Sequence, residues 1–311
     1  MADSDALAAA FEQHRDHLHA VAYRLLGSAS DADDAVQDTW LRMTGADVSA
    51  VDNLAAWLTT VVARVSLNML RSRRREQPAG ESWPDAAETA VAGRAAGRGG
   101  QGPQDQVSPE DEVVLADSVG LALLVVLDTL TPAERLTFVL HDLFAMPFGD
   151  VAAVLGRSAD ATRQLASRAR RRVRGAPRPG RAADFGRQRR VASAFLAASR
   201  GGDLGALLAL LDADVRLTAD AAAVPARRPM VLQGAATVSR GALASAGRAG
   251  LSQLALVNGS VGILFAPAGR LQVVLALTVS EQSLITAIDV IAEPERLRRL
   301  QLAVLPDENG L

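Results

Sequence analysis

The most restrictive feature of the chain is a short apolar segment, residues 148–155, that is followed at once by a long arginine-rich segment, residues 159–174. Gly156 separates the two, and Ser158 is a good N-cap for a helix that starts after it. With Leu165 at the centre of one face, a step of about 100° per residue places the apolar Ala161, Ala169 and Val173 on the same side. The opposite side then carries Asp160, Arg163, Gln164, Ser167, Arg170, Arg171 and Arg174.

A short helix, a glycine turn and a second helix with a polar outer face are typical of the helix-turn-helix motif. In that motif the exposed N-terminal half of the second helix contacts base edges, and arginines further along contact phosphates. Taken alone, this segment leaves an alternative open, a solvated basic helix that binds calmodulin or a membrane surface.

Composition limits the remaining possibilities. A chain of 311 residues, of which 49% are hydrophobic, is long enough for two or three domains with real cores. The net charge is only −2, but residues 157–190 hold twelve arginines against two aspartates. This uneven distribution points to a nucleic-acid footprint on one part of the molecule.

Several classes of site are disfavoured by the residues that the chain lacks. There is no cysteine, which excludes disulfides, thiolate metal ligands and cysteine nucleophiles. Three of the four histidines lie on one amphipathic helix, where a solvated surface is favoured over a metal site. We therefore expect no metal and no cofactor. The acidic N-terminus has no hydrophobic signal core, and no apolar run reaches the roughly 18 residues of a membrane span, so we expect a cytoplasmic protein without a membrane partner.

The pattern predicts four segments along the chain. Residues 1–76 read as helices that share one core, and residues 77–112, rich in Gly, Pro, Gln and Ala, read as a flexible linker. Residues 113–178 form a second helical module, in which Thr131-Pro-Ala-Glu134 is a capping box. Residues 184–311 read as an α+β domain.

In the first module, we expect a helix break at Gly27-Ser28 and a helix that opens after Ser30. This helix turns Val36, Trp40 and Met43 inward. In the last segment, we expect helices at about 187–199 and 203–211, a helix after Gly234 and another from Pro294. Six strands are expected there, at 215–219, 230–233, 253–257, 261–265, 271–279 and 284–291, with Asn258-Gly259 as a hairpin turn.

Three stretches resemble a known family. Residues 31–40 (DADDAVQDTW) and 56–64 (AWLTTVVAR) resemble region 2 of bacterial extracytoplasmic-function (ECF) sigma factors. Residues 130–142 (LTPAERLTFVLHD) through 164–172 (QLASRARRR) resemble region 4. The last third, with residues 257–262 and 288–297, resembles the SnoaL-like (NTF2-like) extension of one sigma group.

The resemblance implies a multidomain fold, with two all-α modules followed by an α+β SnoaL-like domain. It implies a promoter-recognition subunit that directs core RNA polymerase and is not itself an enzyme. Its partners would be promoter DNA and core polymerase, through the β′ clamp and the β flap, with a possible small-molecule ligand in the C-terminal domain.

The resemblance also implies site residues. Polymerase contacts fall on Asp34, Gln37, Trp40 and Leu41, although Trp40 could equally be a core residue. Contacts to the −10 element fall on Asn53, Arg64, Asn68, Arg71 and Arg74, and a solvated helix end is the alternative for the arginine cluster 71–75. Contacts to the −35 element fall on Ser158, Asp160, Arg163, Gln164, Ser167, Arg168, Arg170 and Arg171. Of these, Arg163 and Arg170 or Arg171 are the best candidates for guanine, whereas Arg168 is turned partly inward.

The chain departs from the family in the motifs expected to link its extension to the linker. Where relatives have Trp-Leu-Pro-Glu-Pro and Asp-Gly-Gly-Gly, residues 82–86 read SWPDA and residues 220–223 read DAAA. Asn68 stands where many relatives have aspartate. The regulatory residues implied are Trp83, Asp220, Asn258 and Gly259.

Two other functions stay open. The C-terminal domain could be a cyclase- or isomerase-like enzyme with Asp214, Asp220 or Asp289 as a base whose pKa apolar walls raise. The domain has no histidine and no tyrosine, and a structural role for each aspartate is favoured. Alternatively, the chain could be a helix-turn-helix regulator with a ligand-binding domain, but that function leaves the polar face of Asp34 and Gln37 without a purpose.

Overall fold

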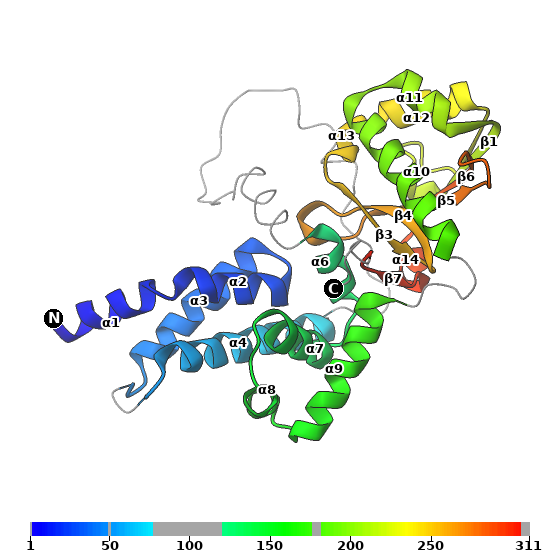
Figure 1. Ribbon diagram of the computed structural model, residues 1–311. Coiled ribbons are helices and arrows are strands. Elements are labelled where there is room, and N and C mark those ends of the chain that lie inside the picture. Colours follow the sequence, from blue (N-terminus) through cyan, green and yellow to red (C-terminus); the bar gives the residue numbers. More distant parts are fainter. Residues whose placement is uncertain (1, 49–50, 77–119, 176–181, 306–311) are drawn as a thin grey trace, which may run out of the picture. The chain divides into compact units, whose positions relative to one another are not determined.

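The computed structural model describes residues 2–48, 51–76, 120–175 and 182–305, which fall into two compact units (Figure 1). The first unit is all helical and combines residues 2–76 with residues 120–174. The second combines helices with a seven-stranded sheet and spans residues 175–305. The expectation of helical modules followed by an α+β domain is therefore confirmed.

The N-terminal part of the helical unit contains α1 (Ala2–Glu12), α2 (Arg15–Leu26), α3 (Ala29–Thr44) and α4 (Leu54–Glu76). Apolar side chains at helical spacing on α2, α3 and α4 meet in one core, because each helix has a single apolar stripe to bury. The fully buried members of this core include Leu18, Leu25, Met43, Leu58 and Val62.

The break between α2 and α3 is built from two residues with opposite roles. Gly27 ends α2 in the left-handed conformation, with φ +74°, and its N–H donates to the carbonyl of Tyr23. Ser28 caps α3, and its hydroxyl accepts from the N–H of Asp31 at 3.4 Å. The predicted break is correct, but the expected helix start after Ser30 is wrong. Ser28 takes the cap because it has the extended backbone that an N-cap needs.

The second part of the helical unit contains α6 (Leu121–Asp128), α7 (Pro132–Thr137), the π-helix η1 (Phe138–Leu143), α8 (Phe148–Leu155) and α9 (Ala159–Arg174). The predicted capping box is present. The Glu134 N–H donates to the Thr131 hydroxyl at 3.3 Å, and the Glu134 carboxylate accepts from the Thr131 N–H at 3.1 Å. Gly156 ends α8 with φ +65°, which is the glycine turn expected between the two helices.

Arg135 joins the two parts of the helical unit. Its side chain is 3% exposed and donates to the Asp128 carboxylate at 2.8 Å and to the Arg24 carbonyl at 3.4 Å. Burial lowers the pKa of Arg135, and the nearby Asp128 carboxylate counteracts this effect. Phe144 packs edge-on against the His17 ring and lies under the Arg24 guanidinium.

We expect Gly27→Ala to destabilise the helical unit by about 1–2 kcal/mol, because an L side chain is strained at this positive φ. A Cβ there would also lie 3.1 Å from Nη2 of Arg135. Urea unfolding followed by tryptophan fluorescence measures this change, because all three tryptophans precede residue 120. Gly149→Ala is the control, since Gly149 has nothing within 4 Å of a built Cβ and lies in α8. It should be neutral or stabilising, and equal losses in both variants would contradict the explanation.

The second unit starts with α10 (Ala182–Gly201) and α11 (Leu204–Leu210), and continues with β1 (Leu211–Ala219), β2 (Met230–Gln233), α12 (Ala235–Ala244) and α13 (Ala246–Ala249). A meander follows, with β3 (Ser252–Val257), β4 (Ser260–Phe265), β5 (Val273–Val279) and β6 (Ile285–Ile291). The chain then forms α14 (Pro294–Arg299) and β7 (Leu302–Ala303). The strand order is β2-β1-β6-β5-β4-β3-β7, and every pair is antiparallel except β1 with β6.

One face of this sheet packs on helices. Phe195 and Leu196 of α10, Leu207 of α11 and Val238 of α12 share a core with alternate strand residues, including Val215, Leu217, Ile263, Leu277 and Ile288. This arrangement agrees with the α+β domain expected for residues 184–311. All six predicted strands are present, and β7 and α13 are additional.

The elements of the second unit differ from expectation mainly at their ends. Helix α10 begins at Ala182 rather than near 187, and β1 begins at Leu211, where a helix end was predicted. The Asn258-Gly259 turn is confirmed. Both residues have positive φ, +52° and +80°, which a two-residue hairpin turn needs to match the right-handed twist of its strands.

Candidate nucleic-acid interface

Helix α9 has two chemically distinct faces. Thr162, Leu165, Ala166, Ala169 and Val173 are buried against the rest of the helical unit. The outward positions expected from the sequence are exposed, except Arg170, which is half-buried: they are Asp160, Arg163, Gln164, Ser167, Arg171 and Arg174. Arg168, expected to turn partly inward, is also exposed.

The N-terminal end of α9 is capped as predicted, since the Ser158 hydroxyl accepts from the Ala161 N–H at 3.2 Å. Arg163 pairs with Asp160 one turn away at 2.5 Å, and its guanidinium lies 5.7 Å from the centre of the Phe148 ring of α8. A helix-turn-helix protein inserts this end of the helix into DNA. Here it carries an arginine, Arg163, that contacts both a carboxylate and an aromatic ring.

Arginines further along α9 are held by carboxylates of other elements. Arg170 donates through Nε to Asp142 of η1 at 2.5 Å. Arg172 donates to Glu134 of α7 at 3.0 Å, and Nε of Arg168 lies 3.8 Å from the other oxygen of the same carboxylate. Arg157, Arg171 and Arg174 make no ion pair within the described part of the chain.

A second basic stripe lies on α4. Arg64, Asn68 and Arg71 are exposed at helical spacing, so their side chains share one face. Nη2 of Arg64 donates to the Ala153 carbonyl of α8 at 3.2 Å. Asn53 is exposed too, and its side chain accepts from the Ala56 N–H at 3.0 Å at the start of α4. Arg74 belongs to α4, but its side chain is outside the described part.

The expected polymerase face is on α3. Asp34 and Gln37 are exposed, and Leu41 has 59% of its surface exposed, the highest value among the large apolar residues described as exposed. Trp40 differs from these three, because its half-buried ring packs edge-on against Phe11 at 5.1 Å. The contact with Phe11 supports the core role that was left open for Trp40.

The implied regulatory residues have structural explanations where they are described. Asp220 is buried and caps a short 3-10 helix, Ala221–Ala223, whose alanines need no positive φ. Its carboxylate accepts from the N–H groups of Ala223, Ala292 and Glu293, and pairs with Arg296. Asn258 exchanges backbone and side-chain hydrogen bonds with Gln301, and Gly259 completes its turn. Trp83 lies outside the described residues.

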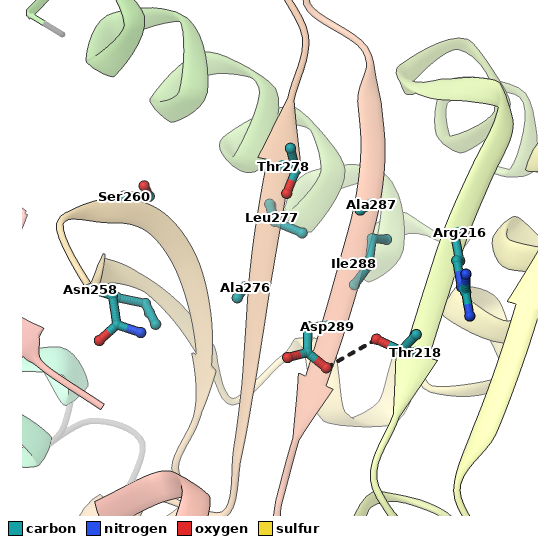
Figure 2. A pocket seen from close by; sticks show the side chains of 11 residues that line it. Arg216, Thr218, Asn258, Ser260, Ala276, Leu277, Thr278, Ala287, Ile288 and Asp289 are labelled. Carbon is teal, nitrogen blue, oxygen red and sulfur yellow. Dashed lines mark hydrogen bonds between the residues drawn. The ribbon is translucent and has the colours of Figure 1, made fainter. Parts of the chain in front are cut away.

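A pocket of about 280 Å³ lies on the sheet of the second unit (Figure 2). Asp289 and Thr218 come from neighbouring strands and share a hydrogen bond of 3.1 Å there, and Asp289 also pairs with Arg296 at 2.7 Å. The pocket is lined by Arg216, Thr218, Val257, Asn258, Ser260, Ala276, Leu277, Thr278, Ala287, Ile288 and Asp289.

None of the three aspartates considered as a catalytic base has the surroundings that this role requires. Asp220 accepts three backbone N–H bonds and pairs with the Arg296 guanidinium, so its carboxylate oxygens are occupied by structural contacts. Asp289 is neutralised by Arg296, and Asp214 is exposed outside the pocket.

Among the residues that the structure describes, no cluster of three potential metal ligands occurs. No helix within the same residues is long and apolar enough to cross a membrane.

Two family models match the chain where the helical unit lies. Residues 10–76 match sigma-70 region 2, and residues 120–173 match sigma-70 region 4. The ECF RNA polymerase sigma factor SigJ of Mycobacterium tuberculosis is 40% identical over 259 residues, which cover 81% of this chain and 78% of SigJ. The probable ECF RNA polymerase sigma factor SigI of the same organism is 34% identical over 97% of this chain and 98% of SigI. The crystal structure of SigJ aligns with 93% of this chain and 98% of that one at 34% identity, with a TM-score of 0.44.

The two family models and the two sequence relatives define a transcription initiation factor that binds promoter DNA together with RNA polymerase. The chain belongs to the ECF family of RNA polymerase sigma factors, with an α+β domain after region 4. It directs core RNA polymerase to promoters and is not an enzyme in its own right.

The ion pairs of α9 are the part of the site that the sequence did not reveal. Glu134 is recognisable as the third residue of a capping box, but nothing in its spacing indicates that Arg168 and Arg172 reach it. Asp142 and Arg170 are likewise 28 residues apart. Such pairs depend on how α7, η1 and α9 cross, and a helical wheel for a single helix contains no information on that crossing.

Proposed function

We propose that promoter recognition is divided between two helices of the helical unit. Region 2, residues 1–76, contacts the −10 element through Asn53, Arg64, Asn68, Arg71 and Arg74. Region 4, residues 113–178, contacts the −35 element through α9, with Ser158, Asp160, Arg163, Gln164, Ser167, Arg168, Arg170 and Arg171 on the DNA side. The observation that carries this proposal is that one face of α9 is buried and the opposite face is exposed. The buried apolar face determines which side chains can contact DNA.

A promoter library randomised at both elements tests the division. Gln164→Ala should change base preference only at −35, because Gln164 is exposed on the outer face of α9. Asn68→Asp should change preference only at −10, and its small volume change at an exposed position should leave the fold intact. Run-off products sequenced from each variant give both preferences. A change at −10 in Gln164→Ala, or at −35 in Asn68→Asp, contradicts the assignment.

We further propose that Asp34, Gln37 and Leu41 of α3 bind the β′ clamp of the polymerase, with Trp40 supporting them from the Phe11 side, and that region 4 binds the β flap. Exposure of a large apolar side chain beside polar ones is typical of a protein-binding surface. A protein that works on core polymerase acts where transcription occurs, in the bacterial cytoplasm.

The α+β domain, residues 184–311, is proposed to regulate the helical unit, with the SnoaL-like topology as its scaffold. The predicted linker, residues 77–112, joins the two helical modules and lies outside the described residues. The pocket containing Thr218 and Asp289 supports a small polar ligand, because acceptors and donors converge there beside Leu277 and Ile288. Thr278 is an exposed residue that lines the pocket. Thr278→Trp would therefore fill the pocket without disturbing the core between the sheet and the helices. A ligand role predicts altered transcription in this variant, and unchanged output counts against it.

A further inference from the structure

We propose that Glu134 and Asp142 act as electrostatic restraints that lower the sequence-independent DNA affinity of α9. They do so by neutralising Arg168, Arg170 and Arg172. This inference rests on the proposed role of α9 as the helix that contacts DNA, and it adds a function for two acidic residues that lie outside α9.

The two carboxylates come from elements other than α9. Glu134 and Asp142 lie 38 and 28 residues before their arginine partners Arg172 and Arg170, on separate elements packed against α9. Pairs of this kind differ from the local Asp160–Arg163 pair, which any helix can form three residues apart. They form only when region 4 is folded, so the folded module determines which arginines are compensated.

Glu134 is held in a buried environment. Its side chain is 5% exposed, whereas Arg168 and Arg172 are 57% and 53% exposed. The carboxylate is fixed by hydrogen bonds from the Thr131 N–H and the Thr131 hydroxyl. A fixed, buried charge cannot move away when DNA approaches, so it cancels part of the field of both exposed guanidinium groups.

Neutralised arginines attract DNA phosphates less strongly than free ones. Sequence-independent affinity comes from the counterions that cationic side chains release from phosphates, and each contact adds about 0.9 to the slope of log K against log salt. An arginine already neutralised by a carboxylate releases fewer counterions. The uncompensated Arg157, Arg171 and Arg174 would then supply most of the phosphate attraction, and binding would depend more on base contacts and on polymerase.

Glu134→Gln is a sharp test, because glutamine also serves as the third residue of a capping box while it removes the negative charge. The full-length protein is titrated against a random-sequence DNA duplex over a salt series, with fluorescence anisotropy as the readout. We expect the salt slope of Glu134→Gln to steepen by about 1.8 and that of Asp142→Asn by about 0.9. Affinity at low salt should rise by about threefold for each released arginine.

Two further variants make the test specific. Asp150→Asn removes the same charge from an exposed position of α8 that pairs with no arginine in the described residues, and its slope should match that of the wild type. Adding Arg168→Gln and Arg172→Gln to Glu134→Gln should return the slope to the wild-type value or below it.

The inference is overturned if Glu134→Gln and Asp142→Asn leave the slope unchanged or weaken binding. It is also overturned if Asp150→Asn steepens the slope as much as they do, or if none of the proteins binds the duplex at low salt. This assay contains no polymerase, so its outcome is separate from the promoter assay. If Gln164→Ala alters the −35 preference but the salt slopes do not change, the restraint alone is refuted. If the salt slopes change as expected but Gln164→Ala leaves the −35 preference unaltered, the −35 assignment alone is refuted.

Discussion

Leu41→Arg should weaken binding of the protein to core RNA polymerase by about thirtyfold, which corresponds to about 2 kcal/mol of binding free energy. Leu41 is 59% exposed on α3, next to the exposed Asp34 and Gln37. A leucine in the centre of a protein interface loses its water on binding, and an arginine there would bring an uncompensated charge into that interface. Surface plasmon resonance with immobilised core enzyme measures the change.

The matched control is Leu251→Arg, because Leu251 is 38% exposed in the second unit and lies on no proposed interface. It introduces the same side chain in place of the same apolar one. Both variants should unfold at the wild-type urea concentration, since neither position is buried. Equal affinities of Leu41→Arg and the wild type would remove α3 from the polymerase interface, and equal losses in both variants would show a nonspecific charge effect.

Arg135→Ala should lower the free energy of unfolding of the helical unit by about 3 kcal/mol. The guanidinium is almost completely buried between α7 and the C-terminal end of α2, where it bonds to Asp128 and to the Arg24 carbonyl. Truncation leaves that carbonyl without this donor and opens space where the side chain packed. Equilibrium urea unfolding, monitored by the fluorescence of Trp40 and Trp57, reports this unit.

Arg15→Ala serves as the comparison for Arg135→Ala. Arg15 also pairs with a carboxylate, Glu12, but both side chains are more than half exposed. Loss of such a pair should change the free energy of unfolding by less than about 0.5 kcal/mol. If the two arginine variants have the same stability, Arg135 does not hold α7 to α2 in the way described.

Much of the fold could be predicted from the sequence because its local signals agree with one another. The capping box at Thr131, the glycine at 156 and the Asn258-Gly259 turn each fix a backbone geometry by their own chemistry, independent of the rest of the molecule. Turn signals located the six strands for the same reason, although β1 begins at Leu211 and not at 215. Strand β7 escaped prediction because two residues carry no periodicity, and it exists only by pairing with β3.

The surface of the site was only partly predictable. The wheel of α9 identified six of the seven outward positions as exposed, since exposure follows from the buried stripe on the other side, but Arg170 is half-buried and Arg168, expected to turn partly inward, is exposed. A helical wheel describes one helix, so it could not indicate that Arg170 would be bound by Asp142, or that Trp40 of α3 would pack on Phe11 of α1. Both contacts join separate helices. Asp220 was singled out through a family motif, and the structure gives it the physical role of a helix cap and an ion-pair partner.

The most direct test of the account is run-off transcription on a genomic promoter library, with core RNA polymerase alone, with the wild-type protein, and with the Leu41→Arg and Gln164→Ala variants. Defined start sites are expected with the wild-type protein and not with core enzyme alone. The account further predicts loss of these products with Leu41→Arg and a changed −35 preference with Gln164→Ala. Transcripts from core enzyme plus the wild-type protein that do not differ from those of core enzyme alone would contradict it.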